Sequence, residues 1–172
     1  MLAVRMTILG TRELDLALDN VLRVVYDWRP LWPKLIKLFH NVESSQFSEE
    51  GSAGRSGAWP QLTPRYAAWK QKHWPGRKIL QRTGTLRRSL ATLNAPGSIE
   101  DASSSFCLVL GTFVPYAIYH QQGTKYMQAR PPVSLTADAN RKFGKEFQKF
   151  INTDALKGFD GVQRRLPFGV QV

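Results

Sequence analysis

The sequence predicts one compact domain in which helices accompany a small antiparallel pair of strands. Helical periodicity marks residues 11–48 and again residues 137–151, and a hairpin pattern lies between them at 90–112. The chain has 172 residues, 42% of them hydrophobic, so it has enough apolar material to bury a sizeable core. We expect this domain to cover residues 1–152 and a tail or arm to occupy 153–172.

The first part of the chain predicts a long helix that is broken near Pro30. Between Thr11 and Trp28 apolar residues recur at helical spacing, and Thr11 is a candidate N-cap. Proline disfavours helical geometry in the residue before it, so the first helix should end there and a second should begin near Pro33. The predicted apolar stripes are Leu14, Leu18, Val21, Leu22 and Val25, and then Leu35, Leu38, Phe39, Val42 and Gln46 or Phe47. Each stripe needs a sheet or a partner to cover it.

The middle of the chain alternates loops with short elements. Residues 48–60 are rich in Gly and Ser, and we expect a loop there that is mobile at 48–58. Thr63-Pro64 predicts the start of a short helix that ends at Pro75-Gly76. Thr83-Gly84 predicts a tight turn, followed by one helical turn and then a strand.

A β-hairpin is predicted from two arms of β-compatible residues. The arms are residues 90–93 and 106–113, and a polar link joins them. The second arm is apolar at consecutive positions, which favours cover on both faces and burial of Cys107, the single cysteine. One cysteine also excludes an internal disulfide.

After the hairpin the sequence predicts a short helix, an extended segment and a final helix. Residues 116–122 favour one or two helical turns that end at Gly123, and the Pro131-Pro132 pair forces an extended chain. Residues 133–136 suit a short strand. The last predicted helix runs over 137–151. Its apolar side consists of Phe143, Phe147, Phe150 and Ile151.

The net charge of +11 is concentrated in one part of the chain. No Asp or Glu occurs between Gly51 and Gly97, where we expect a basic contact surface. Its members are Arg55, Arg65, Lys70, Lys72, Arg77, Lys78, Arg82, Arg87 and Arg88. Such a block indicates contact with nucleic acid, an acidic protein surface or a membrane surface, and charge alone does not choose among them.

The sequence contains no arrangement typical of an enzyme. Catalysis needs a nucleophile with a base, paired carboxylates or a metal, whereas the 13 acidic residues cluster in the first helix and the loop after it or stand singly. His40, His73 and His120 lie far apart and there is one cysteine, so we expect no metal and no cofactor. No stretch approaches the ~18 consecutive apolar residues that a membrane helix requires, so we also expect no membrane contact.

Aromatic and basic residues alternate around the predicted helix at 64–74, which leaves two interpretations open. The rings of Trp59, Tyr66, Trp69, His73 and Trp74 are able to stack on nucleic-acid bases. In the favoured interpretation the helix buries its tryptophans against its own core or a neighbouring subunit and leaves its lysines in water, because no nucleic-acid module is recognisable. His120 is likewise interpreted as a polar anchor in a packed turn rather than a proton carrier.

Five short motifs follow one another between Phe47 and Leu135. The first is a helix that ends in Phe, and the second is a Gly-rich loop that leads to Trp-x-x-Leu. The other three are an Ile-Leu-x-x-Thr-Gly-x-Leu-x-x-Ser core, a Tyr-Ala-x-x-His-x-x-Gly turn and an Ala-Arg-Pro motif. This succession resembles the virion morphogenesis and tail-completion proteins of tailed bacteriophages, the Mu-like group and the related small neck proteins. The matching positions are Phe47, Trp59, Leu62, Leu80, Thr83, Gly84, Leu86, Ser89, Tyr116, Ala117, His120, Gly123, Ala129, Arg130 and Pro131. The chain departs from the commonest family pattern at Gln122, where an aromatic is usual, and at Pro132, where Phe is usual.

The resemblance implies an α+β subunit with a small, mainly antiparallel sheet packed against helices. It implies a structural component of the virion without catalysis, which forms a ring of six or twelve copies at the head-tail junction. The ring would join the head connector or stopper to the tail terminator after assembly in the cytoplasm of the host bacterium. In this picture Arg130 contacts a carboxylate of the core or of the next subunit, and Tyr116, Tyr119 and His120 set the turn that presents it.

Two functions follow for the basic segment. In a head-to-tail ring each subunit needs two different complementary patches, and the acidic first helix and the basic middle segment are candidates for that pair. The alternative function is a DNA-binding protein that grips phosphate through residues 55–88, and within a neck the genomic DNA passes through in any case. Salt separates the two, because phosphate binding weakens steeply with log[salt] and an apolar ring contact persists.

Overall fold

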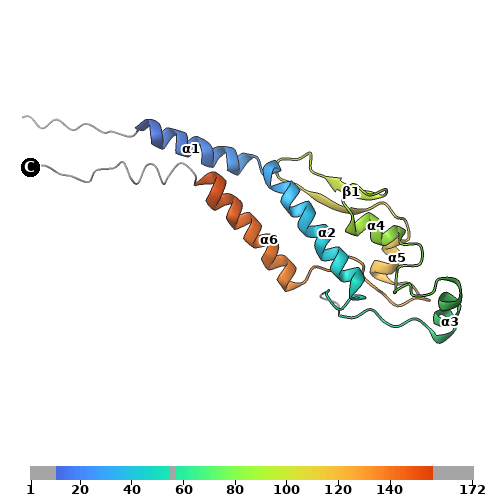
Figure 1. Cartoon of the computed structure of the whole chain (residues 1–172). Coiled ribbons are helices and arrows are strands. Elements are labelled where there is room, and N and C mark those ends of the chain that lie inside the picture. Colours follow the sequence, from blue (N-terminus) through green and yellow to red (C-terminus); the bar gives the residue numbers. More distant parts are fainter. Residues whose placement is uncertain (1–10, 55–56, 157–172) are drawn as a thin grey trace, which may run out of the picture.

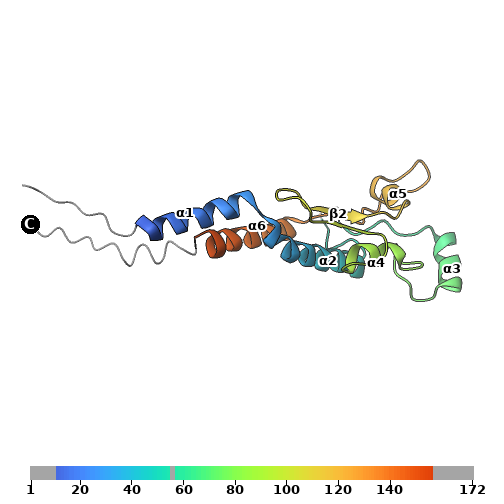
Figure 2. The same ribbon diagram turned by 90° about the horizontal axis from the view of Figure 1, so that it is seen from above.

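The computed structural model describes residues 11–54 and 57–156 and shows an elongated α+β fold (Figure 1). Helices α1 (Thr11–Tyr26) and α6 (Ala137–Phe150) lie side by side at one end of the molecule, and α3 (Pro64–His73) lies at the other (Figures 1 and 2). The fold class predicted from the sequence is confirmed. Most of the predicted tail, residues 157–172, lies outside the described residues.

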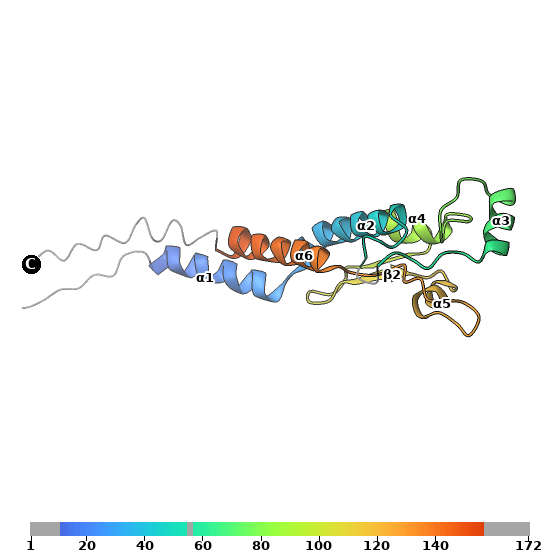
Figure 3. The same cartoon turned by 90° about the horizontal axis from the view of Figure 1, so that it is seen from below.

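The middle of the molecule is built on α2 (Trp32–Ser48). Helix α4 (Thr85–Ala91) packs against α2, and the hairpin of β1 (Ser98–Asp101) and β2 (Val109–Thr112) packs against α4 (Figure 3). The short α5 (Ala117–Gln122) follows the hairpin and lies toward the same end as α3 (Figure 3).

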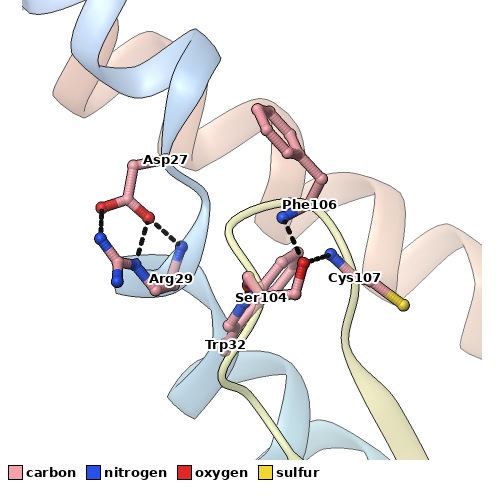
Figure 4. Close-up of polar contacts among 6 residues, drawn as sticks. All are labelled: Asp27, Arg29, Trp32, Ser104, Phe106 and Cys107. Carbon is pink, nitrogen blue, oxygen red and sulfur yellow. Dashed lines mark hydrogen bonds and ion pairs between the residues drawn. The ribbon is translucent and has the colours of Figure 1, made fainter.

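The predicted break between the first two helices is confirmed. A 3-10 turn at Arg29–Leu31 contains the proline and separates α1 from α2. Asp27 fixes this turn, because its Oδ1 accepts from the Arg29 backbone N at 3.0 Å and from Arg29 Nε at 2.8 Å, while its Oδ2 accepts from Nη2 at 2.8 Å (Figure 4). These hydrogen bonds hold the pKa of Asp27 at about 2.

The apolar face of α1 differs from the prediction. Ala17 and Val24 are buried, and α1 contacts the π-helical turn Ile151–Ala155 that continues α6. Most of the predicted stripe is left exposed, with fractions of 40–52%: Leu14, Leu18, Leu22 and Val25. The apolar arc of the helix is wider than the surface available to cover it within one chain.

The predicted hairpin exists, but its first arm is wrong. Ser98 pairs with Thr112 and Asp101 with Val109 in an antiparallel register, so the first strand lies inside the expected polar link. The residues predicted as the first arm end α4 instead, where Leu90 is completely buried. An apolar side chain at this position serves packing against α2, and the hydrophobic pattern alone does not separate that from a strand.

The turn of the hairpin docks onto the start of α2. Trp32 Nε1 donates to the Ser104 carbonyl at 2.9 Å, and Ser104 Oγ accepts from the backbone N of Phe106 and of Cys107, both at 3.2 Å (Figure 4). Cys107 is exposed, so its predicted burial is wrong. The predicted cover on both faces of the second arm is also wrong, since Val109 is exposed. Only one side of the hairpin faces the core.

Two groups of buried residues form the core. One joins Val24 of α1, the start of α2 and Phe150 of α6, and the other joins the end of α2 to Trp59 and Leu86. Leu110 of β2 and Phe143 of α6 pack against both groups. The predicted apolar sides of α2 and α6 are therefore largely confirmed, although Ile151 is exposed.

After a turn closed by the bridge between Thr124 and Met127, the segment that leads to α6 forms no strand among the described residues. Val133 pairs instead with a side chain: Gln121 Nε2 donates to its carbonyl at 3.0 Å, and its N donates to Gln121 Oε1 at 3.2 Å. The predicted strand at 133–136 is wrong, because the amide of Gln121 replaces a neighbouring strand. None of the helices described is long and apolar enough to cross a membrane.

Candidate functional site

Two of the sequence motifs hold each other across the fold. Arg130 donates from Nε to the Pro60 carbonyl at 2.7 Å and from Nη2 to the Gln61 carbonyl at 2.9 Å. In return, Trp59 Nε1 donates to the Pro131 carbonyl at 2.9 Å. The expectation that Arg130 meets a carboxylate of the core is wrong, because its acceptors are main-chain oxygens. Its contact with a next subunit stays a prediction.

The Trp59 side chain is seated by the end of α2 and the loop after it. Phe47 contacts it edge-on with 5.5 Å between ring centroids, and both rings are buried. Gly51 has a φ of 93°, and a Cβ there would lie 2.5 Å from Trp59 Cδ1. The glycine is therefore required twice over, by the backbone and by the ring above it. Arg55 of the same loop lies outside the described residues.

Gly123 allows the turn that brings Arg130 into place. It has a φ of 78°, and a Cβ on it would lie 2.9 Å from the Ala129 backbone N. This close approach lets the Arg130 N donate to the His120 carbonyl at 2.8 Å. His120 thus anchors the turn through its main chain. The tight turn predicted at Gly123 is confirmed.

The Thr83-Gly84 turn opens α4, as predicted. Gly84 has a φ of 77° and precedes the first helical residue. Packing explains two further positions of this motif, because Leu86 and Ser89 are both buried. Ser89 Oγ hydrogen-bonds the Leu86 carbonyl at 2.9 Å and Thr112 Oγ1 at 2.7 Å, which connects α4 to β2.

Seven of the predicted motif residues line a single cavity of about 1020 Å³ between α3, the start of α4 and α5. They are Leu62, Leu80, Thr83, Leu86, Tyr116, His120 and Arg130. Motif residues outside the lining, among them Trp59, Gly84, Ser89, Gly123 and Pro131, hold the elements that form it. Spacing in the sequence thus marked positions that converge in space.

The cavity is basic. Its lining includes Lys70, Arg82 and Arg130, and no carboxylate among the described residues that form it. Lys70 is 5% exposed, so the expectation that the lysines of this helix lie in water is wrong for Lys70. Its Nζ donates to the Lys78 carbonyl at 2.5 Å. Burial lowers the pKa of Lys70 in spite of the nearby Glu50 carboxylate.

His120 lines this cavity, and one of its ring nitrogens is unpaired among the described residues. Its Nδ1 is buried and has no hydrogen-bond partner in the described part of the chain. Its ring meets that of Tyr116 edge-on at 5.9 Å. Burial is the largest cause that lowers the pKa of His120, and the charge of Arg130 lowers this pKa further. The ring is therefore neutral at pH 7.

Most of the predicted basic surface is exposed. Besides the buried Lys70, the described members are Arg65, Lys72, Arg77, Lys78, Arg82, Arg87 and Arg88, all in the exposed class. They are spread over α3, the segment after it and α4. Of these residues, Arg82 lines the cavity, and so does the buried Lys70.

The aromatic residues of α3 are stacked on one another rather than buried in the core. Trp69 lies 5.6 Å from Tyr66, 4.7 Å from His73 and 5.1 Å from Trp74, measured between ring centroids. Arg82 covers the Trp74 ring at 5.3 Å. Trp69 is 41% exposed, so its predicted burial against the core of its own chain is wrong. Burial against a neighbouring subunit stays a prediction.

A buried ion pair that no motif marks connects α2 to β1. His40 Nδ1 lies 2.6 Å from the Leu90 carbonyl and Nε2 lies 3.0 Å from Glu100 Oε1. His40 therefore connects α2 both to the end of α4 and to β1. Burial alone would raise the pKa of Glu100, but bonds from Ser98, Asn94 and His40 outweigh it and lower the pKa.

Glu43 is a second buried group that sequence periodicity does not reveal. It is fully buried in α2, and neither carboxyl oxygen has a hydrogen-bond partner among the described residues. Burial raises the pKa of Glu43 to about 8, so the carboxyl is protonated at neutral pH. The only sequence signal is its position, four residues after Phe39 on the buried side of the helix.

The described residues were compared with the requirements of a metal site and with known proteins. Within residues 11–54 and 57–156 no group of three or more His, Cys, Asp or Glu side chains is placed to hold a metal ion. Neither a curated protein nor a solved structure matches the chain significantly. The profile of the phage virion morphogenesis family matches residues 9–146, which is most of the chain and includes every motif position named above. The chain therefore belongs to the phage virion morphogenesis family, whose proteins serve the assembly of the virus particle.

Proposed function

We propose that the chain is a structural subunit of the phage head-tail junction, where copies form a ring that joins the head connector to the tail terminator. Family membership supports the wider role in virion assembly. The ring is supported by one observation above all, which is the uncovered apolar side of α1.

The exposed residues Leu14, Leu18, Leu22 and Val25 form one continuous side of α1, which we name the α1 strip. Their spacing places them on neighbouring turns of the helix. A helix that leaves such a row in water gains stability when another surface covers it. An assembly protein with this feature is therefore expected to bind a further protein surface through α1.

The distribution of charge supports a ring over a symmetric dimer. Helix α1, which carries the α1 strip, and helix α3, which carries part of the basic surface, lie at opposite ends of the molecule (Figures 1 and 2). A ring requires unlike, complementary patches on each subunit, whereas a two-fold dimer uses the same patch twice. This subunit has an apolar surface at one end and a basic surface toward the other, so it has the two unlike patches that a ring requires.

A genetic experiment tests the proposed place of the protein. In the phage that encodes the chain, a nonsense mutation in its gene should give filled heads and separate tails, and purified protein added to the lysate should restore joined particles. Antibody against the protein should label the junction in electron micrographs. Normal particles from the mutant, or label elsewhere on the virion, would contradict the proposal.

A second candidate function is binding to genomic DNA. It is favoured by the exposed cations around the stacked rings of Tyr66 and Trp69, which offer both phosphate contacts and a stacking surface. Duplex binding that falls linearly in log[salt] would support it. Binding that is absent even at low salt would exclude it.

A further inference from the structure

We propose that the cavity between α3 and α5 receives the α1 strip of a second copy of this chain, with the carboxylates of Asp15 and Asp19 meeting the cations that line it. The inference rests on the proposed ring and names the contact that holds it. It assigns the cavity a ligand class, which is a helix surface that is apolar and acid-edged.

The cavity has cationic groups that the chain itself does not neutralise. Arg130 is 8% exposed, and its Nε and Nη2 donate to main-chain carbonyls, which carry no charge. Its Nη1 has no acceptor in the described part of the chain. Among the described residues, Arg82 contacts the face of Trp74 and forms no ion pair. Lys70 also lines the cavity, but the Glu50 carboxylate lies near it and compensates part of its charge. Cations with so little compensation favour an incoming carboxylate.

The cavity lining also contains many apolar side chains, which favour one kind of anionic ligand. Leu62, Leu80, Leu86 and Met127 line it together with Tyr66, Tyr116 and Tyr126. A bare phosphate or a nucleic-acid backbone would satisfy the cations and leave these surfaces in water. A ligand that carries carboxylates beside aliphatic side chains satisfies both.

The α1 strip has this composition. Asp15 and Asp19 are four residues apart, so they lie on one side of the helix, next to Leu18 and Leu22. All four residues are exposed. Neither aspartate has an ion-pair partner among the residues that the structure describes. This side of α1 therefore offers the aliphatic surface and the negative charge that the cavity favours in a ligand.

The contact must form between copies. α1 and the α3–α5 region occupy opposite ends of the elongated fold, so the strip of one chain does not reach the cavity of the same chain (Figures 1 and 3). A contact between two different patches is heterologous, and it continues from copy to copy until a ring closes. The arrangement thus fits the ring better than a pairing of two α1 strips.

Cross-linking of single-cysteine chains tests the contact. Two full-length proteins carry Cys107→Ser together with either Leu18→Cys or Tyr126→Cys. Both positions are exposed, by 46% and 91%, so folding is preserved. A short bis-maleimide should link the two chains when they are mixed. The matched control replaces the Tyr126→Cys chain with the unsubstituted chain, whose exposed Cys107 lies outside the cavity lining.

Two results would overturn the inference. One is efficient linking of Leu18→Cys to itself, which would show two strips packed together. The other is absence of the mixed product at concentrations where the chain is associated. Linking of the mixed pair, with little product in the control, supports the inference.

A charge exchange tests the electrostatic part. Arg82→Glu should weaken association by about tenfold or more, because it places like charges opposite Asp15 and Asp19. Adding Asp15→Arg and Asp19→Arg to the same chain should restore association. Arg77→Glu is the matched control, since Arg77 is exposed in the same basic segment and does not line the cavity. Equal weakening by Arg77→Glu, or no rescue by the exchange, would overturn the contact.

Failure of the inference and failure of the proposed function are distinguishable. If the charge variants associate normally and the protein still joins heads to tails, the junction role survives and the cavity contact does not. If Arg82→Glu lowers only affinity for duplex DNA, the cavity belongs to a phosphate-binding surface and the inference is wrong.

Discussion

The indole Nε1 of Trp59 donates to the Pro131 carbonyl at 2.9 Å, and this bond joins two motifs that lie far apart in the sequence. The neighbouring Arg130 returns two hydrogen bonds to Pro60 and Gln61. Together these contacts fix one wall of the basic cavity against another. The spacing of the two motifs thus has a physical basis in reciprocal hydrogen bonds between them.

Arg130→Lys is expected to destabilise the fold by about 1–3 kcal/mol, because lysine keeps the charge but loses the forked pair of bonds to two carbonyls. Urea unfolding followed by tryptophan fluorescence measures the change. Arg77→Lys serves as a control at an exposed position and should leave the unfolding midpoint unchanged. Equal midpoints for the wild type and Arg130→Lys would show that this pair of bonds contributes nothing.

Gly123→Ala is expected to be more damaging than Gly84→Ala. The two glycines have nearly equal φ, 78° and 77°. A Cβ at Gly123 would lie 2.9 Å from the Ala129 N, whereas a Cβ at Gly84 would meet no atom of the described residues within 4 Å. Gly84→Ala should cost about 1–2 kcal/mol from the left-handed backbone alone. Gly123→Ala should cost roughly 1–3 kcal/mol more. Thermal unfolding of both variants decides the point, and equal losses would refute the role of the close approach.

Glu43 should make the protein less stable as the pH rises. Burial raises its pKa in the folded chain from the ordinary 4.5 to about 8, so between these values the folded state holds a proton that the unfolded state has lost. The stabilisation is complete below pH 4.5 and is lost progressively toward pH 8, by up to roughly 1.4 kcal/mol per pH unit.

The isosteric variant Glu43→Gln removes this titration, and Glu43→Leu also removes both unpaired oxygens. We expect the free energy of unfolding of either variant to depend less on pH between 5 and 8 than that of the wild type. Urea titrations at several pH values measure it. The same slope in all three proteins would show that Glu43 is ionised or solvated in the folded state.

Glu100 should act in the opposite direction. Bonds from Ser98, Asn94 and His40 lower its pKa in the folded chain, so its stabilisation is present above the ordinary value of 4.5 and is lost as the pH falls through the folded value. Glu100→Gln should lower stability at pH 7 by roughly 1.5–3 kcal/mol, because a neutral amide replaces the carboxylate that accepts hydrogen bonds from Ser98 and Asn94. The variant should also show a weaker loss of stability in acid, as measured by circular dichroism from pH 7 to pH 3. An unchanged acid transition would count against the ion pair.

Local signals predicted much of the fold because they act within a few residues. Pro30 and Pro33 set the break between α1 and α2, and the phenylalanines of α6 recur at helical spacing. The first hairpin arm was placed wrongly because Leu90 serves a contact with α2, which lies about fifty residues earlier in the chain. Long-range packing of this kind has no local signature.

The candidate site was predicted in part. Motif spacing marked Thr83, His120 and Arg130, but nothing local shows that these residues meet around one cavity. The burial of Lys70 was missed because a lysine between aromatic residues has the pattern of a solvated helix face. The α1 strip was correctly found as apolar, and its exposure in the single chain is a property that periodicity does not report.

The mass of the purified protein in solution, measured by light scattering at low and high salt, tests the central claim most directly. The account predicts a ring-sized oligomer that persists at high salt and falls apart in Leu18→Lys, where a charge enters the α1 strip. A monomer at both salt concentrations that binds duplex DNA at low salt and releases it at high salt would contradict the account.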